Sequence, residues 1–418
     1  MFIAITGDPV LDFVIIQALS LHYLSNAALR LIKWKDTEYR YIREMPIPPV
    51  ISWYDKASFS YIRETREAGR PCIKTTGYSI QTMSRLSNIL SNYNTSSLLS
   101  NPSLYLELKS SAALQLMFCI EYMEKNKCDF GEKSAVLEGG SYFIPDGLEK
   151  EDFPDFIPVL KEIYLNLTND LDPGIVNTME LADILRGVSA WLNRIHFDYR
   201  NDFLTSLALE VLNRKSRNGL FCFNTADYAL LPPGRQFFVM DALLQAFPFI
   251  QLDYILEEIF SVYLKLHRML YNENNGIYVF KPRIISYNAF DVGALLSFLN
   301  RASHYSFNKS EQTNTINKIL DVYLELLLGS YHRAHDNEIK KLIRWVKLSR
   351  TIQSNIKKQP GFNTVFPKRI YITTSNQDFN WNRKGIIDQT GVFFLCSALL
   401  SLINNRSDRF KLKKSAPL

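Results

Sequence analysis

The sequence predicts an all-α protein in which helical hairpins repeat to form an (α/α)6-type toroid, with short β hairpins in the loops. Two observations carry this prediction. Apolar residues recur at three- and four-residue steps through most of the 418 residues, which is the spacing of one face of a helix. A short helical motif also returns with a period of 52 residues, and a period of this length is typical of stacked helical hairpins.

Eight windows show the helical spacing and are expected to form helices: residues 79–93, 104–123, 156–167, 181–195, 203–212, 252–270, 316–328 and 392–403. Three shorter stretches, 278–280, 284–285 and 369–372, lie between them beside Gly, Pro or Asn. Such stretches form hairpins or extended loops.

The repeated motif reads small or acidic residue, Ala, large residue, Leu, polar residue. Its alanines are Ala190, Ala242, Ala294 and Ala398, at intervals of 52, 52 and 104 residues, the last being twice 52. The copy expected near Val346 matches poorly. A unit of this length holds two helices of about 15 residues with their loops, and such a hairpin must stack on neighbours to bury both faces.

A second motif, a glycine followed by an aromatic extended stretch, occurs at 218–223 and 275–280, with looser copies at 361–366 and 139–143. The glycine is expected to supply a left-handed cap at the end of an outer helix. Alanines and glycines on the inner helices are expected to let these helices approach closely.

The loop at 218–223 and the helix at 236–247 together resemble the hairpin units of the six-hairpin glycosidase-like superfamily, and the likeness covers about residues 180–405. The resemblance implies an (α/α)6 barrel with a cleft where inner-helix N-termini and long loops gather. It also implies a carbohydrate substrate acted on by Asp or Glu residues from those loops. The expected division is an N-terminal arm or small extra layer at 1–75, the toroid at 76–405 and a basic tail at 406–418.

The candidate site residues lie mainly in the loops that enter inner helices. The catalytic candidates are Asp227, Asp291, Asp388, Tyr287 and His196. The candidates for binding substrate are Tyr228, Arg235, Gln236, Asn288, Trp381 and Arg383. Two carboxylates can act as acid and base when burial raises the pKa of one of them. The alternatives remain open, because Asp at a helix start often only caps the helix, and a histidine such as His196 is more often a satisfied, partly buried structural residue than a catalytic one.

No metal site and no cofactor are expected. His332 and His335 share a helix face but are not part of a zinc motif. The sequence lacks the glycine-rich dinucleotide motif, the P-loop, the nucleophile elbow and paired CxxC motifs, which disfavours those classes of protein.

Charge and cysteine content bear on partners and location. A net charge of +6 is small for a chain of this length and does not indicate a nucleic-acid partner. Five cysteines without CxxC spacing indicate buried, reduced thiols and a cytoplasmic protein.

The apolar residues 1–24 are interrupted by Asp8, Pro9 and Asp12, so neither a membrane span nor a signal peptide is expected. A leader removed from the natural protein is the alternative.

Two functions therefore remain. The first is a carbohydrate-active enzyme (glycoside hydrolase, polysaccharide lyase or epimerase) that acts on a carbohydrate or other small polar substrate, with Tyr287 or His196 as the base of a lyase or epimerase. The second is a non-enzymatic helical-repeat binding or scaffold protein. The substrate and the oligomeric state stay open.

Overall fold

The computed structural model describes the chain in several stretches. The long ones are residues 72–92, 104–143, 156–197, 199–224, 229–273, 285–305 and 389–414. The short ones are most of 10–18 and the pieces 52–55, 60–63, 277–278, 316–320, 370–372 and 379–381. The chain divides into two compact units. The middle unit comprises Asp55–Tyr93 and Ser103–Tyr271, and the terminal unit comprises Met1–Tyr54, Asn94–Pro102 and Asn272–Leu418.

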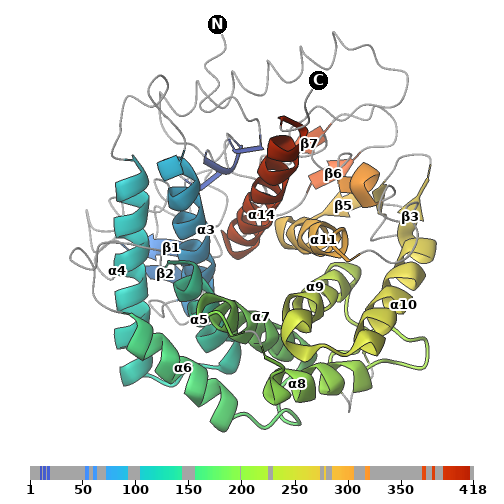
Figure 1. Cartoon of the computed structure of the whole chain (residues 1–418), viewed down its shortest axis with the longest axis horizontal. Helices are drawn as coiled ribbons and strands as arrows, with labels where there is room; N and C mark the ends of the chain where they lie inside the picture. Colours follow the sequence, from blue (N-terminus) through green and yellow to red (C-terminus); the bar gives the residue numbers. More distant parts are fainter. Residues whose placement is uncertain are drawn as a thin grey trace, which may run out of the picture. The chain divides into compact units, whose positions relative to one another are not determined.

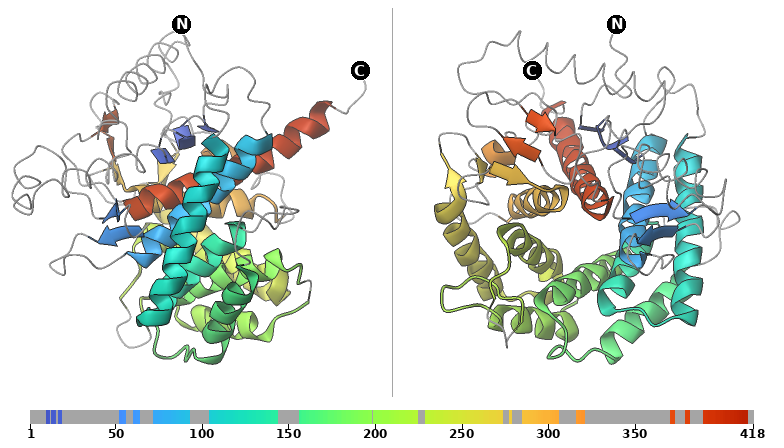
Figure 2. Two further views of the ribbon diagram at one scale, coloured as in Figure 1. Left: turned by 90° about the vertical axis from the view of Figure 1, so that its left-hand side faces the viewer. Right: turned by 180° about the vertical axis from the view of Figure 1, so that it is seen from behind.

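The middle unit is a series of helices in which buried and half-exposed members alternate. Its elements are β2 (Ser60–Arg63), α3 (Ile73–Asn92), α4 (Leu104–Lys125), α5 (Phe130–Phe143), α6 (Ile157–Asn169), α7 (Thr178–Arg194), α8 (Asp202–Asn213), α9 (Pro233–Ile250) and α10 (Asp253–Leu270). We call α3, α5, α7 and α9 inner helices, because they are buried on nearly every side and pack on one another in this order. The outer helices α4, α6, α8 and α10 follow them in the chain and pack against them, as Figure 1 and Figure 2 show.

Small residues allow the close packing of the inner helices. A Cβ atom on Gly77 of α3 would lie 2.6 Å from the carbonyl group of Ala135 in α5. A Cβ atom on Gly187 of α7 would lie 2.6 Å from the carbonyl oxygen of Ser134, also in α5. No side chain fits at either contact, so the prediction of closely packed inner helices is confirmed.

The terminal unit contains two packed helices and a small sheet. These two helices are α11 (Ala289–Ala302) and α14 (Gln389–Lys414), and the described part of the unit also contains β4 (Ile277–Tyr278) and short helical stretches at 316–320 and within 10–18. Strands β5 (Ile285–Tyr287), β6 (Ile370–Ile372) and β7 (Phe379–Trp381) form an antiparallel sheet in that order. The boundary between the units falls within β1 (Ser52–Asp55) and β3 (Tyr271–Asn272).

The helical prediction is confirmed wherever the structure describes the predicted windows. The motif alanines lie in α7, α9, α11 and α14, and all four are buried. Two expectations about glycine are wrong. Residues 139–143 belong to α5 and form no loop, and Gly219, although its φ is +72°, closes a turn with Ser216 beyond the end of α8.

The described part of the chain contains no helix long and apolar enough to cross a membrane. The division into 1–75, 76–405 and 406–418 stays a prediction. The window 321–328, the residue Val346 and the loop copy at 361–366 lie outside the described residues.

Candidate active site

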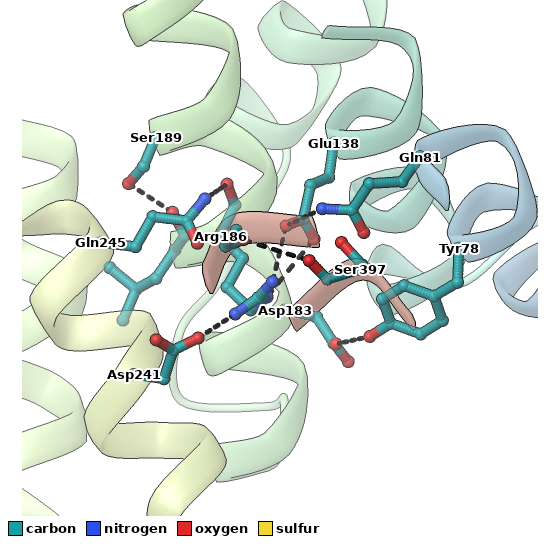
Figure 3. A network of polar contacts seen from close by, with 11 residues as sticks. Tyr78, Gln81, Glu138, Asp183, Arg186, Ser189, Asp241, Gln245 and Ser397 are labelled. Atoms are coloured by element: carbon teal, nitrogen blue, oxygen red, sulfur yellow. Dashed lines mark hydrogen bonds and ion pairs between the residues drawn. The ribbon is translucent and has the colours of Figure 1, made fainter. Parts of the chain in front are cut away.

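A belt of buried polar side chains joins the four inner helices of the middle unit. Each contributes its ninth residue, namely Gln81, Glu138, Arg186 and Asp241. Gln81 donates to Glu138 at 3.0 Å, and Arg186 donates to both oxygens of Glu138, at 2.7 and 3.3 Å, and also to Asp241. Figure 3 shows these contacts, which connect the four helices at the same level along their lengths.

The guanidinium group of Arg186 is the positive centre of this belt. Burial disfavours its charge, but Glu138 and Asp241 outweigh the burial and raise the pKa of Arg186 above its ordinary value. The arginine therefore stays charged between two buried carboxylates. On α9, Gln245 adds a hydrogen bond of 3.1 Å from its side chain to the carbonyl oxygen of Arg186.

A second polar cluster lies nearer the N-terminal ends of the inner helices, around Asp183 of α7. Its Oδ2 atom accepts from the ammonium group of Lys74, and its Oδ1 atom accepts from the Tyr78 hydroxyl at 3.2 Å. The Asp183 side chain is 3% exposed, whereas the Lys74 side chain is 30% exposed. Burial raises the pKa of the Asp183 carboxyl group, although the ammonium group of Lys74 opposes this change.

The start of α5 brings a second carboxylate close to Asp183. Asp129 caps α5 by accepting from the backbone N–H of Glu132 at 2.7 Å, and Asp129 is exposed. A Cβ atom on Gly131, in the same turn, would lie 3.2 Å from Asp183 Oδ2, 3.3 Å from Asp129 Oδ1 and 3.8 Å from Lys74 Nζ. Two carboxylates and an ammonium group thus converge on one point, and the two carboxylate oxygens are no more than about 6.5 Å apart.

Similar caps begin helices α7 and α11. Asn177 caps α7 and forms a reciprocal pair with Glu180, and Asn288 caps α11 by accepting from the backbone N–H of Asp291 at 2.7 Å. The Asn288 side chain also donates to Asp291 Oδ2 at 2.7 Å. Helix N-termini favour acidic groups, and these pairs satisfy backbone donors that the helices cannot satisfy themselves.

The sheet of the terminal unit gathers four of the sequence candidates. Tyr287 of β5 and Trp381 of β7 are both paired with Ile370 of β6. Asn288 and Asp291 directly follow β5 and begin α11. Asp291 is half-buried, and its contact with Asn288 is the capping arrangement that the sequence left open as an alternative.

Three other sequence candidates take clear positions in the middle unit. Arg235 is half-buried in the first turn of α9, and Gln236 beside it is buried. The Gln236 amide bonds to backbone groups of Phe221 and Leu231, so it fastens the preceding loop. His196 is exposed, has a φ of +52° and lies just past the C-terminal end of α7. Asp227, Tyr228, Arg383 and Asp388 lie outside the described residues.

The cysteines are free and buried, as the sequence predicted for this class of side chain. Within the described ranges, no group of three or more His, Cys, Asp or Glu side chains is placed to hold a metal ion. His332 and His335 fall in a stretch that the structure does not describe.

The sequence candidates come from the loops that enter the later helices, so they do not include Asp129, Asp183, Lys74 or Tyr78. A signal existed in the sequence. Glu138, Arg186 and Asp241 each stand alone among apolar or small neighbours, and charged residues are rarely buried without a partner. Asp241 even occupies the first position of the repeated motif.

No protein-family model and no curated protein matches the sequence. Among solved structures, an unsaturated glucuronyl hydrolase specific for heparin matches over 96% of this chain and 98% of that chain, with a TM-score of 0.53 and 9% sequence identity. The chain has the α/α toroid fold. The predicted fold class and the resemblance to six-hairpin glycosidase-like proteins are therefore confirmed at the level of the fold.

Proposed function

We propose that this toroid is a carbohydrate-active enzyme, a glycoside hydrolase, lyase or epimerase, that uses carboxylates at the N-terminal ends of inner helices. The observation that carries the proposal is the convergence of Asp129, Asp183 and Lys74 on the position that a Cβ atom of Gly131 would occupy. The likeness in fold to a glucuronyl hydrolase supports the substrate class.

The two carboxylates have surroundings that suit different roles. Asp183 is buried and its pKa is raised, as a proton donor requires, while Asp129 is exposed and accepts a backbone hydrogen bond. Asp183 would protonate the leaving oxygen, and Asp129 would act as base or nucleophile. Hydrolases place such a pair about 5–9.5 Å apart, a range that this pair can meet.

The proposal retains the residues expected from the sequence in the terminal unit and in the loops. Asp291 is a further candidate acid or base, with Tyr287, Asn288 and Trp381 gathered by the sheet before it. Asp227 and Asp388 keep their proposed roles in catalysis, and Tyr228, Arg235 and Arg383 keep theirs in binding. His196 and Gln236 do not join this site, because His196 lies past the C-terminal end of α7 and the buried Gln236 amide is bonded to backbone groups. A cytoplasmic location is also proposed, because free buried cysteines suit a reducing compartment.

The test is an activity screen with oligosaccharides, beginning with heparin fragments that carry an unsaturated glucuronyl end. We expect Asp183→Asn and Asp129→Asn each to lower kcat/KM by at least about 100-fold. Gly131→Ala, which fills the space between the carboxylates, should also lower it. Asp253→Asn is the matched control, because Asp253 is an exposed acid at the start of the outer helix α10.

Three outcomes decide between the functions. Loss of activity in the site variants but not in the control supports the assignment to Asp129 and Asp183. Loss confined to Asp291→Asn moves the chemistry to the start of α11. If no oligosaccharide is turned over and none raises the thermal midpoint, the enzyme proposal fails and the alternative of a binding or scaffold protein takes its place.

A further inference from the structure

We propose that Lys74 and Tyr78 are positioning residues that hold the Asp183 carboxyl group over the first turn of α5, and that Lys74 controls how readily this group takes up a proton. This inference rests on the proposed function for its catalytic consequence. Its structural content can be tested without any substrate.

The two residues act on Asp183 from one face of α3. They are four positions apart, so their side chains lie on the same side of the helix. Each holds a different oxygen of the carboxyl group: the ammonium group of Lys74 contacts Oδ2, and the Tyr78 hydroxyl donates to Oδ1 at 3.2 Å. A carboxyl group held at both oxygens cannot turn freely about its last bond.

This clamp joins two helices that are not neighbours in the series. Helices α3 and α7 each pack on α5, and their side chains meet over the first turn of α5, beside Gly131. Because Gly131 has no side chain, the contact between Lys74 and Asp183 can pass across α5. The clamp therefore fixes Asp183 of α7 relative to Asp129, which caps the start of α5.

The two positioning residues differ in their access to solvent. The Lys74 side chain is 30% exposed, whereas Asp183 is 3% exposed and Tyr78 is 1% exposed. Burial and the neighbouring Asp183 carboxylate raise the pKa of the Tyr78 hydroxyl well above its ordinary value, so it remains a donor. Lys74 is thus the member of the clamp that an incoming ligand can reach.

The charges around Asp183 explain why Lys74 has this control. Asp183 faces Lys74 and Tyr78 of α3 and Asp129 and Glu138 of α5. On its own helix, Asp183 is followed by Arg186, which is paired with Asp241 of α9. Burial favours the neutral acid, and Lys74 is the cation in direct contact that opposes it. Removing this cation should leave a group that keeps its proton to higher pH.

The test follows the titration of Asp183 itself by carboxyl infrared or 13C NMR signals, assigned by their loss in Asp183→Asn. In Lys74→Met we expect the titration midpoint to move to higher pH, and in Lys74→Arg we expect it to return toward the wild-type value. Tyr78→Phe should also raise it, because one donor to the charged form is lost. A circular dichroism spectrum of each variant checks that it is folded.

Two results would overturn the inference: an unchanged midpoint in folded Lys74→Met, or a Lys74→Arg chain that behaves like Lys74→Met. Activity gives a separate readout. If the enzyme is active, the pH at which kcat/KM falls should shift in the same direction as the midpoint. A shifted midpoint in a chain without activity would uphold the clamp and refute the proposed function, so the two failures are distinguishable.

Discussion

Replacement of Arg186 by methionine removes the guanidinium group that contacts both Glu138 and Asp241 in the polar belt. The side chains of the two carboxylates are 3% and 0% exposed, so water cannot replace the lost partner. Both acids then lose the guanidinium group that neutralises them. The variant tests whether the belt holds the inner helices together.

The expected loss of stability follows from the free energies of the two kinds of contact that Arg186 makes, its ion pairs and its contact with an aromatic ring. A buried ion pair broken by removal of one partner costs about 3–5 kcal/mol. Arg186 also lies over the Phe238 ring at 5.4 Å, and this contact is worth about 0.5–2 kcal/mol. Methionine keeps much of the apolar packing, so the charge term dominates. We expect the free energy of unfolding to fall by about 3 kcal/mol or more.

The assay is urea unfolding followed by circular dichroism, with Arg217→Met as control, because Arg217 is an exposed arginine of the same unit. The control should change stability by less than about 0.5 kcal/mol. The triple variant R186M/E138M/D241L removes the whole charge cluster and should recover most of the loss, since apolar groups often replace buried ion triads without penalty. A loss below about 1 kcal/mol in R186M, or no recovery in the triple variant, would refute the reasoning.

Three further predictions concern packing, pH and thiols. Gly77→Ala should lower the free energy of unfolding by about 1–3 kcal/mol in urea titrations, because its Cβ atom would meet the Ala135 carbonyl group. Burial raises the pKa of Asp183 in the folded protein. The stability that the protonated Asp183 carboxyl group contributes is therefore fully present below its pKa in the unfolded chain, about 3.9, and is lost as the pH rises through its pKa in the folded protein. The stability of Asp183→Asn minus that of the wild type should therefore increase between pH 4 and pH 7 in thermal unfolding, and a constant difference would contradict this assignment. A thiol reagent should label none of the five cysteines in the native protein and all five after unfolding, and rapid labelling of any native cysteine would contradict their burial.

The sequence predicted most of the helices because their burial is periodic. The window 104–123 became α4 (Leu104–Lys125), and the window 252–270 became α10 (Asp253–Leu270). Helix α5 escaped prediction for a physical reason. Gly139 and Gly140 were interpreted as a loop, whereas both lie inside the helix where the neighbouring residues Gly77 and Leu160 leave no room for a side chain.

The candidate site was harder to predict because it depends on contacts between distant segments. Lys74 and Asp183 are 109 positions apart, and the local sequence around either residue does not predict its contact with the other. Tyr287 and its strand partner Ile370 are also far apart in the sequence. Residues next to helix starts, such as Asn288 and Asp291, were easier to find because capping is a local property.

The polar belt also has a consequence for how the middle unit folds. Glu138 on α5 is neutralised by Arg186 on α7, which also neutralises Asp241 on α9. A nascent chain that ended between these helices would contain a charge in its core without a counter-ion. Each hairpin of the middle unit therefore gains stability only when the next hairpin docks. This dependence links successive hairpins into one cooperative unfolding transition, even though their apolar contacts are between neighbours. Fragments cut between α5 and α9 should accordingly be much less stable than their share of the apolar core alone would indicate.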